Sequence, residues 1–234
     1  MKYALRGFCT RVGVGLGLIM SLCATHAESA SSGKESLSEL TAQWWQWATS
    51  IPTTVNPLAD TNGANCMVGQ RGSVWFLAGS FSTSAVARTC SVPDTAALFL
   101  PVVNFININT PNVCGQNSDN LSADTLRSQI APILDGATNL SVTVDSQPVA
   151  ALRRVKSIVF DVTLPLDNIF NAGCGGPGTV PAGIYSPAVD DGFYVLLRPL
   201  EVGNHTLHIH GEIPSLTFVQ DITYKLIVVE VPHK

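Results

Sequence analysis

The chain of 234 residues has few charged side chains. Asp, Glu, Lys and Arg together make up 13% of it, about half of the roughly one quarter that is usual in globular proteins. The formal net charge is −4, and the sequence contains no basic cluster, charge run or internal repeat. Proteins that bind nucleic acid concentrate basic residues on one surface, so this composition argues against that class of function.

Complete catalytic signatures are also missing. Gly79-Ser-Phe-Ser82 lacks the closing glycine of a Gly-x-Ser-x-Gly nucleophile turn. Gly173-Cys-Gly-Gly-Pro-Gly178 has neither the lysine of a phosphate-binding loop nor the spacing of a dinucleotide-binding loop. No Cys-x-x-Cys pair supports a zinc knuckle or a thioredoxin-like redox site. These absences favour a binding role over catalysis.

Residues 1–27 are typical of a secretory signal peptide. Lys2, Arg6 and Arg11 give a basic start, an apolar run follows, and Thr25-His-Ala27 offers small residues before a cut at Glu28. The apolar run of about twelve residues is too short to cross a bilayer as a helix, and no later segment could cross one. We therefore expect a secreted or periplasmic protein. Residues 28–35 then form a linker, and residues 36–234 form one domain with a possible subdivision near residue 137.

Four cysteines remain after removal of the signal peptide, namely Cys66, Cys90, Cys114 and Cys174. An even number in an oxidising compartment indicates disulfides, and four cysteines allow three pairings. We expect Cys66 to pair with Cys90, because these two flank an apolar strand at Val74–Ala78.

The second expected pair, Cys114 with Cys174, joins two long loops at 104–120 and 167–192. Both loops are rich in Gly, Pro or Asn and have no core of their own, and each carries one cysteine near its middle. Long loops in compact domains are usually functional or cross-linked. The bridged loop pair is therefore the expected binding surface, with Asp190 and Asp191 at its margin.

An amphipathic helix is predicted near the start of the domain. Ser36 and Glu39 form a capping box, and Pro52 stops the helix. Its apolar positions form one stripe: Leu37, Leu40, Trp44, Trp47, Ala48 and Ile51. Trp45 lies about 60° outside that stripe. It either packs into the core with the other two tryptophans or forms a half-exposed platform for a sugar or a partner.

Most of the remaining chain has strand character. Apolar or alternating runs bounded by Gly, Pro, Asn or Asp occur at 74–78, 96–103, 140–144, 155–164, 193–200, 204–213 and 222–231. Pro101 indicates an edge or a bulge. A short second helix begins after Ser122 and is ended by Pro132 and Gly136. The predicted fold is all-β, a sandwich of immunoglobulin-like or jelly-roll type with the N-terminal helix packed against one sheet and a short second helix.

The strand at 204–213 contains a candidate metal site. Residues two apart in a strand share a face, so His208, His210 and Glu212 lie together while Leu207 and Ile209 face the core. Two imidazoles and a carboxylate on one face can bind a divalent metal. The alternative is a polar outer strand face that happens to contain histidines.

Two resemblances to known proteins support the predicted β fold and export. The segments 203–211 and 221–228 resemble the closing strands of bacterial immunoglobulin-like domains. Trp44-Trp-Gln-Trp-Ala48, Gly72–Gly79, Arg88–Pro93 and Gly203-Asn-His205 resemble a recurring set of secreted microbial proteins. The second resemblance implies export and a β fold but no mechanism.

Two functions follow from the sequence. The first is an exported, disulfide-stabilised sandwich with a non-enzymatic binding or envelope-associated role, without a cofactor, whose ligand is a glycan or a protein. The second is a metal-dependent extracellular enzyme centred on His208, His210 and Glu212.

Overall fold

The structure is a computed structural model that describes residues 35–82 and 84–231. The predicted signal peptide at 1–27 and nearly all of the predicted linker lie outside these residues. Among the described residues, no helix is both long and apolar enough to cross a membrane.

Helix α1 (Leu37–Ser50) begins and ends at polar side chains. At its start, the Ser36 hydroxyl accepts a hydrogen bond from the backbone N–H of Glu39, and the Glu39 carboxylate accepts one from the backbone N–H of Ser36. This is the predicted capping box. At its end, the buried Asn56 amide donates to the carbonyl groups of Ala48 and Ile51 at 2.7 and 2.8 Å. Side chains thus satisfy backbone groups at both ends of the helix.

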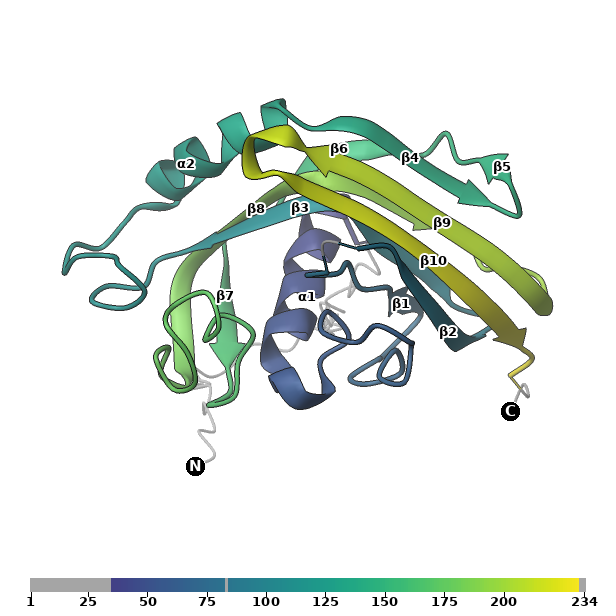
Figure 1. The fold of residues 1–234 in the computed structure, drawn as a ribbon, viewed down its shortest axis with the longest axis horizontal. Coiled ribbons are helices and arrows are strands. Elements are labelled where there is room, and N and C mark those ends of the chain that lie inside the picture. Colours follow the sequence, from purple (N-terminus) through teal and green to yellow (C-terminus); the bar gives the residue numbers. More distant parts are fainter. Residues whose placement is uncertain (1–34, 83, 232–234) are drawn as a thin grey trace, which may run out of the picture. The chain divides into compact units, whose positions relative to one another are not determined.

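Two sheets make up most of the fold (Figure 1). The first, sheet A, has the order β1 (Val74–Phe76), β3 (Ala97–Ile108), β8 (Gly183–Leu197) and β6 (Arg153–Lys156), and β7 (Phe160–Leu164) pairs with β8 beside β6. The second, sheet B, has the order β2 (Val86–Pro93), β10 (Phe218–Val229), β9 (Gly203–Ile213), β4 (Thr138–Val144) and β5 (Gln147–Pro148). The pairs β1–β3 and β2–β10 are parallel and the other pairs are antiparallel. Short 3-10 helices occupy Thr53–Val55 and Pro214–Leu216.

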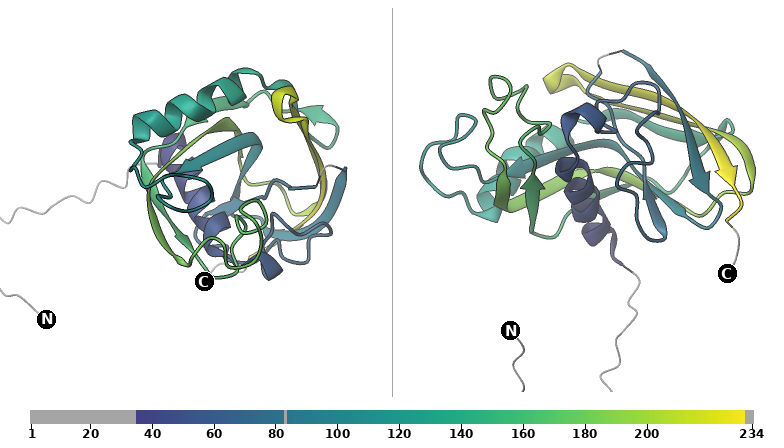
Figure 2. Two further views of the ribbon diagram at one scale, coloured as in Figure 1. Left: turned by 60° about the vertical axis from the view of Figure 1, so that its left-hand side comes forward. Right: turned by 90° about the horizontal axis from the view of Figure 1, so that it is seen from below.

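Sheet A lies between helix α1 and sheet B. Its β3 side chains Leu98 and Leu100 pack with Ile209 and Ile222 of sheet B. Phe99, between them in sequence, packs on the opposite face with the tryptophans of α1. The second helix, α2 (Ala123–Asp135), packs against β8 and β3 on the face opposite α1 (Figure 1). The view from below shows α1 lying across these strands (Figure 2). The predicted all-β sandwich with the N-terminal helix packed on one sheet is confirmed.

Several predicted boundaries are wrong. Strand β3 runs to Ile108, so the first five residues of the loop predicted at 104–120 are strand. The asparagines in this part of β3 form hydrogen bonds through their side chains. For example, the Asn104 amide donates to the Tyr194 hydroxyl at 3.0 Å. The predicted strand 155–164 is two strands with a break at 157–159. Pro132 lies inside α2 rather than at its end.

Both disulfides form the expected pairs. Cys66–Cys90 joins the loop after α1 to β2, and Cys114–Cys174 joins the loops after β3 and β7. Pro101 marks a bulge in β3, as predicted, because the register with β8 shifts between Pro101 and Val103.

Candidate functional site

Asp190 and Asp191 lie in the middle of β8 and not at the margin of a loop. The strand begins at Gly183, so the second long loop, predicted at 167–192, ends ten residues earlier than expected. Both carboxylates are buried, at 0% and 2% exposure, and they point to opposite faces of sheet A because successive strand residues alternate. The prediction that they border a binding surface is therefore wrong.

Trp45 is also buried, so of the two alternatives for this residue the structure supports packing into the core and not the half-exposed platform. Its side chain is 6% exposed, and its indole N–H donates to Oδ1 of Asp190 at 2.7 Å. Helix α1 rests on β6, β7 and β8 together, so the sheet covers more of the helix than the apolar stripe alone. The apolar stripe is narrower than the buried face of the helix, because Trp45 is buried against a carboxyl group and not against an apolar side chain.

One oxygen of the Asp190 carboxyl accepts two hydrogen bonds, and among the described residues the other accepts none. Oδ1 accepts hydrogen bonds from Trp45 and from the Tyr194 hydroxyl, at 2.7 and 2.8 Å. Oδ2 is buried and has no hydrogen-bond partner. Burial raises the pKa of Asp190 to about 8, although the two donors oppose that change. The group is therefore protonated at neutral pH.

Asp191 is paired with an arginine. Arg154 binds it through two hydrogen bonds of 3.0 and 2.8 Å, and also contacts Asp135 and the carbonyl of Ala131 at the end of α2. The hydrogen bond to Asp191 raises the pKa of Arg154. This ion pair fastens α2 to β6 and β8, which is a structural role.

The predicted metal ligands lie on the outer face of sheet B. His208, His210 and Glu212 alternate along β9 with the fully buried Leu207 and Ile209, as predicted. The two imidazole rings stack with centroids 6.5 Å apart.

The sequence missed Asp221, which belongs to the neighbouring strand β10 and pairs directly with His210. Its Oδ1 lies 2.9 Å from Nε2 of His208, and its Oδ2 lies 3.8 Å from Nδ1 of His210. Glu212 Oε1 lies 3.2 Å from Nε2 of His210. Strand register was the signal needed to find Asp221, and a single sequence does not provide it.

These side chains do not converge on a common point. Within residues 35–82 and 84–231, no group of three or more His, Cys, Asp or Glu side chains is arranged to hold a metal ion. Each imidazole is instead directed at a carboxylate. The metal site centred on His208, His210 and Glu212 stays a prediction.

The two loops joined by Cys114–Cys174 order themselves through buried asparagines. The side-chain Oδ1 of Asn109 accepts hydrogen bonds from the Gln116 amide and from the backbone N–H of Leu121, at 2.8 and 2.9 Å. In the other loop, Asn171 donates to the carbonyl of Leu166 and accepts from the N–H of Val180, each at 2.9 Å. A buried amide supplies both a donor and an acceptor, so one side chain fixes two turns of backbone. Asparagine therefore orders these loops, contrary to the sequence argument.

The surface of this loop pair is polar with two apolar points. Its first loop presents a set of exposed side chains: Asn112, Asn117, Ser118, Asp119 and Asn120. Leu166 is 69% exposed in the second loop, and Ile184 is 72% exposed where β8 leaves it. Exposure of this degree is unusual for large aliphatic side chains and marks a contact surface when such residues lie together.

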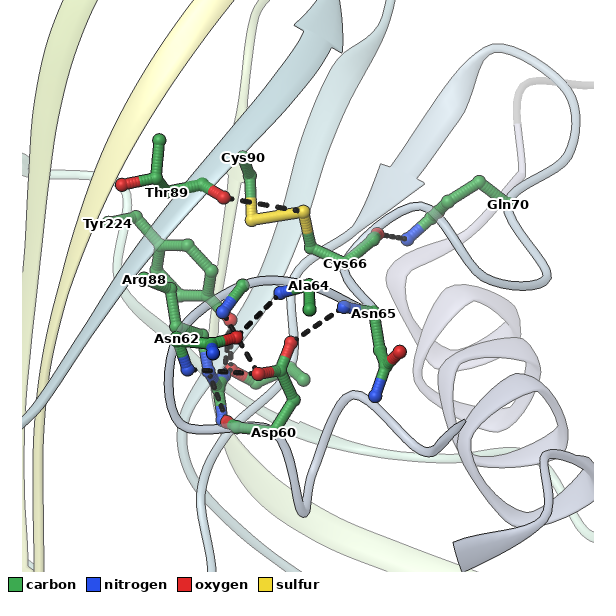
Figure 3. Close-up of a disulfide and its surroundings, with 12 residues drawn as sticks. Asp60, Asn62, Ala64, Asn65, Cys66, Gln70, Arg88, Thr89, Cys90 and Tyr224 are labelled. Carbon is green, nitrogen blue, oxygen red and sulfur yellow. Dashed lines mark hydrogen bonds between the residues drawn. A yellow bond between two sulfur atoms is a disulfide. The ribbon is translucent and has the colours of Figure 1, made fainter. Parts of the chain in front are cut away.

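A buried arginine fastens the other disulfide region (Figure 3). Arg88 is 1% exposed and donates to the carbonyls of Asp60 and Ala78, at 2.8 and 2.9 Å, and to the Tyr224 hydroxyl. The Asp60 carboxylate accepts three backbone N–H groups of the turn that leads to Cys66. These bonds make Asp60 the residue that fixes this turn. Arg88 was not identified from the sequence.

Comparison with known proteins adds no relative: the chain matches no family model, no curated protein and no solved structure. The functional argument therefore depends on the residues themselves.

Proposed function

We propose that the chain is an exported, non-enzymatic binding protein whose partner, a protein, contacts the loop pair joined by Cys114–Cys174. One observation carries the proposal. Two loops from distant parts of the chain are fixed side by side by a disulfide and by buried asparagines, yet their outer side chains are left exposed. Rigid loops on a β scaffold bind with little loss of conformational entropy.

Export is supported by the cysteines. All four cysteines outside the predicted signal peptide are paired. Disulfides persist in secreted and periplasmic proteins and are rare in the reducing cytosol. The predicted signal peptide at 1–27 agrees with this location.

A protein partner fits the loop surface better than a glycan does. Sugars stack on exposed aromatic rings, and Trp45, the candidate for that role, is buried. The most exposed apolar side chains of the loop pair are the aliphatic Leu166 and Ile184, next to amide and hydroxyl groups. An apolar contact ringed by polar groups is the usual anatomy of a protein–protein interface.

The test compares two double variants with the wild type. Purified protein is immobilised and exposed to solubilised envelope proteins of the producing organism, and bound proteins are quantified by mass spectrometry. We expect Leu166→Ser with Ile184→Ser to reduce recovery of the specific partner at least tenfold. The matched control is Ile227→Ser with Val229→Ser, two residues of β10 that are 40% and 43% exposed. It should recover the partner at the wild-type level.

Equal recovery by all three proteins would remove the loop pair from the interface. A glycan array run in parallel separates the ligand classes: a saturable glycan signal that is lost in the loop variant would replace the protein partner with a glycan.

The metal-dependent enzyme is the second candidate. One observation favours it, because Asp221 contacts His208 and lies near His210, which adds a fourth potential ligand to the three from the sequence. It ranks second because the four side chains do not converge.

A further inference from the structure

Asp190 is enclosed between α1 and sheet A without a compensating cation. Within the part of the chain that the structure describes, no lysine, arginine or histidine forms an ion pair with it. Its Oδ2 atom faces no hydrogen-bond partner. An ionised carboxylate in such surroundings is much less stable than the neutral acid, which needs no counterion.

The same residue lies where four elements meet. Its backbone N–H donates to the Ser157 hydroxyl at 2.8 Å, and its carbonyl accepts the N–H of Ser157 at 3.0 Å. Ile158, which follows Ser157 in the sequence, donates its backbone N–H to the carbonyl of Ser38 in α1 at 3.1 Å. On the other face, Arg127 of α2 donates to the carbonyl of Ser157 at 2.7 Å. Asp190 thus connects α1 to the break between β6 and β7.

The charged groups nearby do not neutralise Asp190. Helix α1 contributes only Glu39, which is bonded to Ser36 at its exposed first turn. From β7, Asp161 is exposed. On the α2 face, Asp191 is paired with Arg154 of β6.

Two further groups approach the same junction. Arg127 of α2 is directed at the Ser157 carbonyl. Tyr194 contacts Asp190 directly as a hydrogen-bond donor, and burial together with the Asp190 charge raises its own pKa. No group in contact with the carboxyl therefore becomes positive to offset its ionisation.

We propose that Asp190 is a proton-operated latch for helix α1. The protonated carboxyl holds α1 against β8, and loss of the proton loosens α1 together with the break at 157–159. The exposed Ile158 and Val159 at that break, 47% and 51% exposed, would then lose their anchor on Ser38.

The direction of the effect follows from proton linkage. An aspartate in the opened state loses its proton near pH 4, whereas Asp190 in the closed state keeps it to about pH 8. Between these values the closed state holds one more proton. Rising pH therefore favours opening, by about tenfold in the equilibrium constant per pH unit, until the effect levels off above about pH 8.

The experiment uses the tryptophans as reporters, since three of the four in the chain lie in α1. Acrylamide quenching of the folded protein is measured from pH 5 to pH 10. We expect accessibility of the tryptophans to rise with pH in the wild type and to level off above pH 8. Asp190→Asn, which keeps the neutral shape, should stay protected throughout. An exposed carboxyl of β7 provides the control, because Asp161→Asn should keep the wild-type pH dependence.

A second measurement on the wild type does not depend on whether Asp190→Asn folds. Infrared spectroscopy of the wild type should show one protonated carboxyl at pH 6 that disappears at about pH 8. Tyr194→Phe removes a donor to the carboxylate and should shift that midpoint to higher pH. Absence of the band at pH 6, or the same pH dependence of quenching in Asp190→Asn as in the wild type, would overturn the latch.

Discussion

The side-chain amide of Gln220 connects Ser80 to Val102 through the interior of the protein. Its Oε1 accepts the backbone N–H of Ser80 at 3.0 Å, and its Nε2 donates to the carbonyl of Val102. Val102 lies in the β3 bulge beside Pro101, and β1, only three residues long, ends before it reaches that point. A side chain from sheet B thus completes the hydrogen bonding of sheet A where its own edge strand stops.

Removal of this amide should be costly. Gln220→Leu leaves the buried Ser80 N–H and Val102 carbonyl unpaired, so we expect a loss of roughly 2–4 kcal/mol in the free energy of unfolding. Gln46→Leu is the control, since Gln46 is exposed and its substitution should change stability by less than about 0.5 kcal/mol. Denaturant unfolding measures both. Equal effects would mean that the amide is not a structural bridge.

Gly79 should be coupled to the same amide. A Cβ at position 79 would lie 2.6 Å from Oε1 of Gln220, so Gly79→Ala displaces the bridge. We expect this substitution to destabilise the wild type but to have little effect in a Gln220→Ala background. A double-mutant cycle tests the coupling. Additive effects of the two substitutions would show that the clash lies elsewhere.

Trp44 and Trp45 should contribute similarly to stability. Both side chains are buried, and each indole N–H has an acceptor, Leu77 carbonyl for Trp44 and Asp190 for Trp45. Substitution of either by alanine should cost about 3–5 kcal/mol. Chemical unfolding of the two variants is the measurement. A Trp45→Ala variant as stable as the wild type would restore the exposed platform.

The ion pair between His205 and Asp145 predicts a pH window. The hydrogen bond with Asp145 raises the pKa of His205, and the bond from the Thr206 N–H, followed by that from His205, lowers the pKa of Asp145. The contribution of His205 to the free energy of unfolding is full below about pH 6.5 and is lost as pH rises through its raised pKa. The contribution of Asp145 to the free energy of unfolding is full above about pH 4 and is lost as pH falls through its lowered pKa.

Replacing this histidine should therefore matter only inside that window. We expect His205→Gln to lose about 0.5–1 kcal/mol at pH 5.5, because the pair lies near the surface, and almost nothing at pH 9. Thermal unfolding at the two pH values measures this. A loss that does not depend on pH would mean that the ring acts through packing alone.

Metal analysis separates the two candidate functions. Because the imidazoles of His208 and His210 are directed at carboxylates, we expect protein purified without a histidine tag to be metal-free and unchanged in stability on adding zinc, copper or manganese. Asp221→Asn should likewise leave metal content unchanged. Near-stoichiometric metal that is lost in a His208→Ala, His210→Ala double variant would favour the metal-dependent enzyme.

The sequence predicts features that depend on neighbouring residues. The capping box of Ser36 and Glu39, the alternation around Leu207 and the two disulfides are all visible in local pattern and composition. The capping box and the alternation are decided within one element, whereas the disulfide pairing followed from the placement of the cysteines around a strand and in two long loops.

The candidate site was harder to predict because it depends on polar residues that tertiary structure buries. Asp190 and Asp191 have the composition of a turn, and only their place opposite Asn104–Ile106 in β3 makes them strand residues. Trp45 falls outside the apolar stripe because its partner is a carboxyl group. Arg88 and Gln220 satisfy backbone groups far away in sequence, which no periodicity reveals.

The asparagine-ordered loop pair has a consequence for how this protein can change. The residues that keep the loops in shape, Asn109 and Asn171, are buried, whereas those that face outward, such as Asn117 and Asp119, are exposed. Mutations at the outward positions should therefore change the chemistry of the surface without altering the fold beneath it. Under the proposed function, such a surface acquires new partners by ordinary sequence drift, as the hypervariable loops of an antibody do on a constant framework.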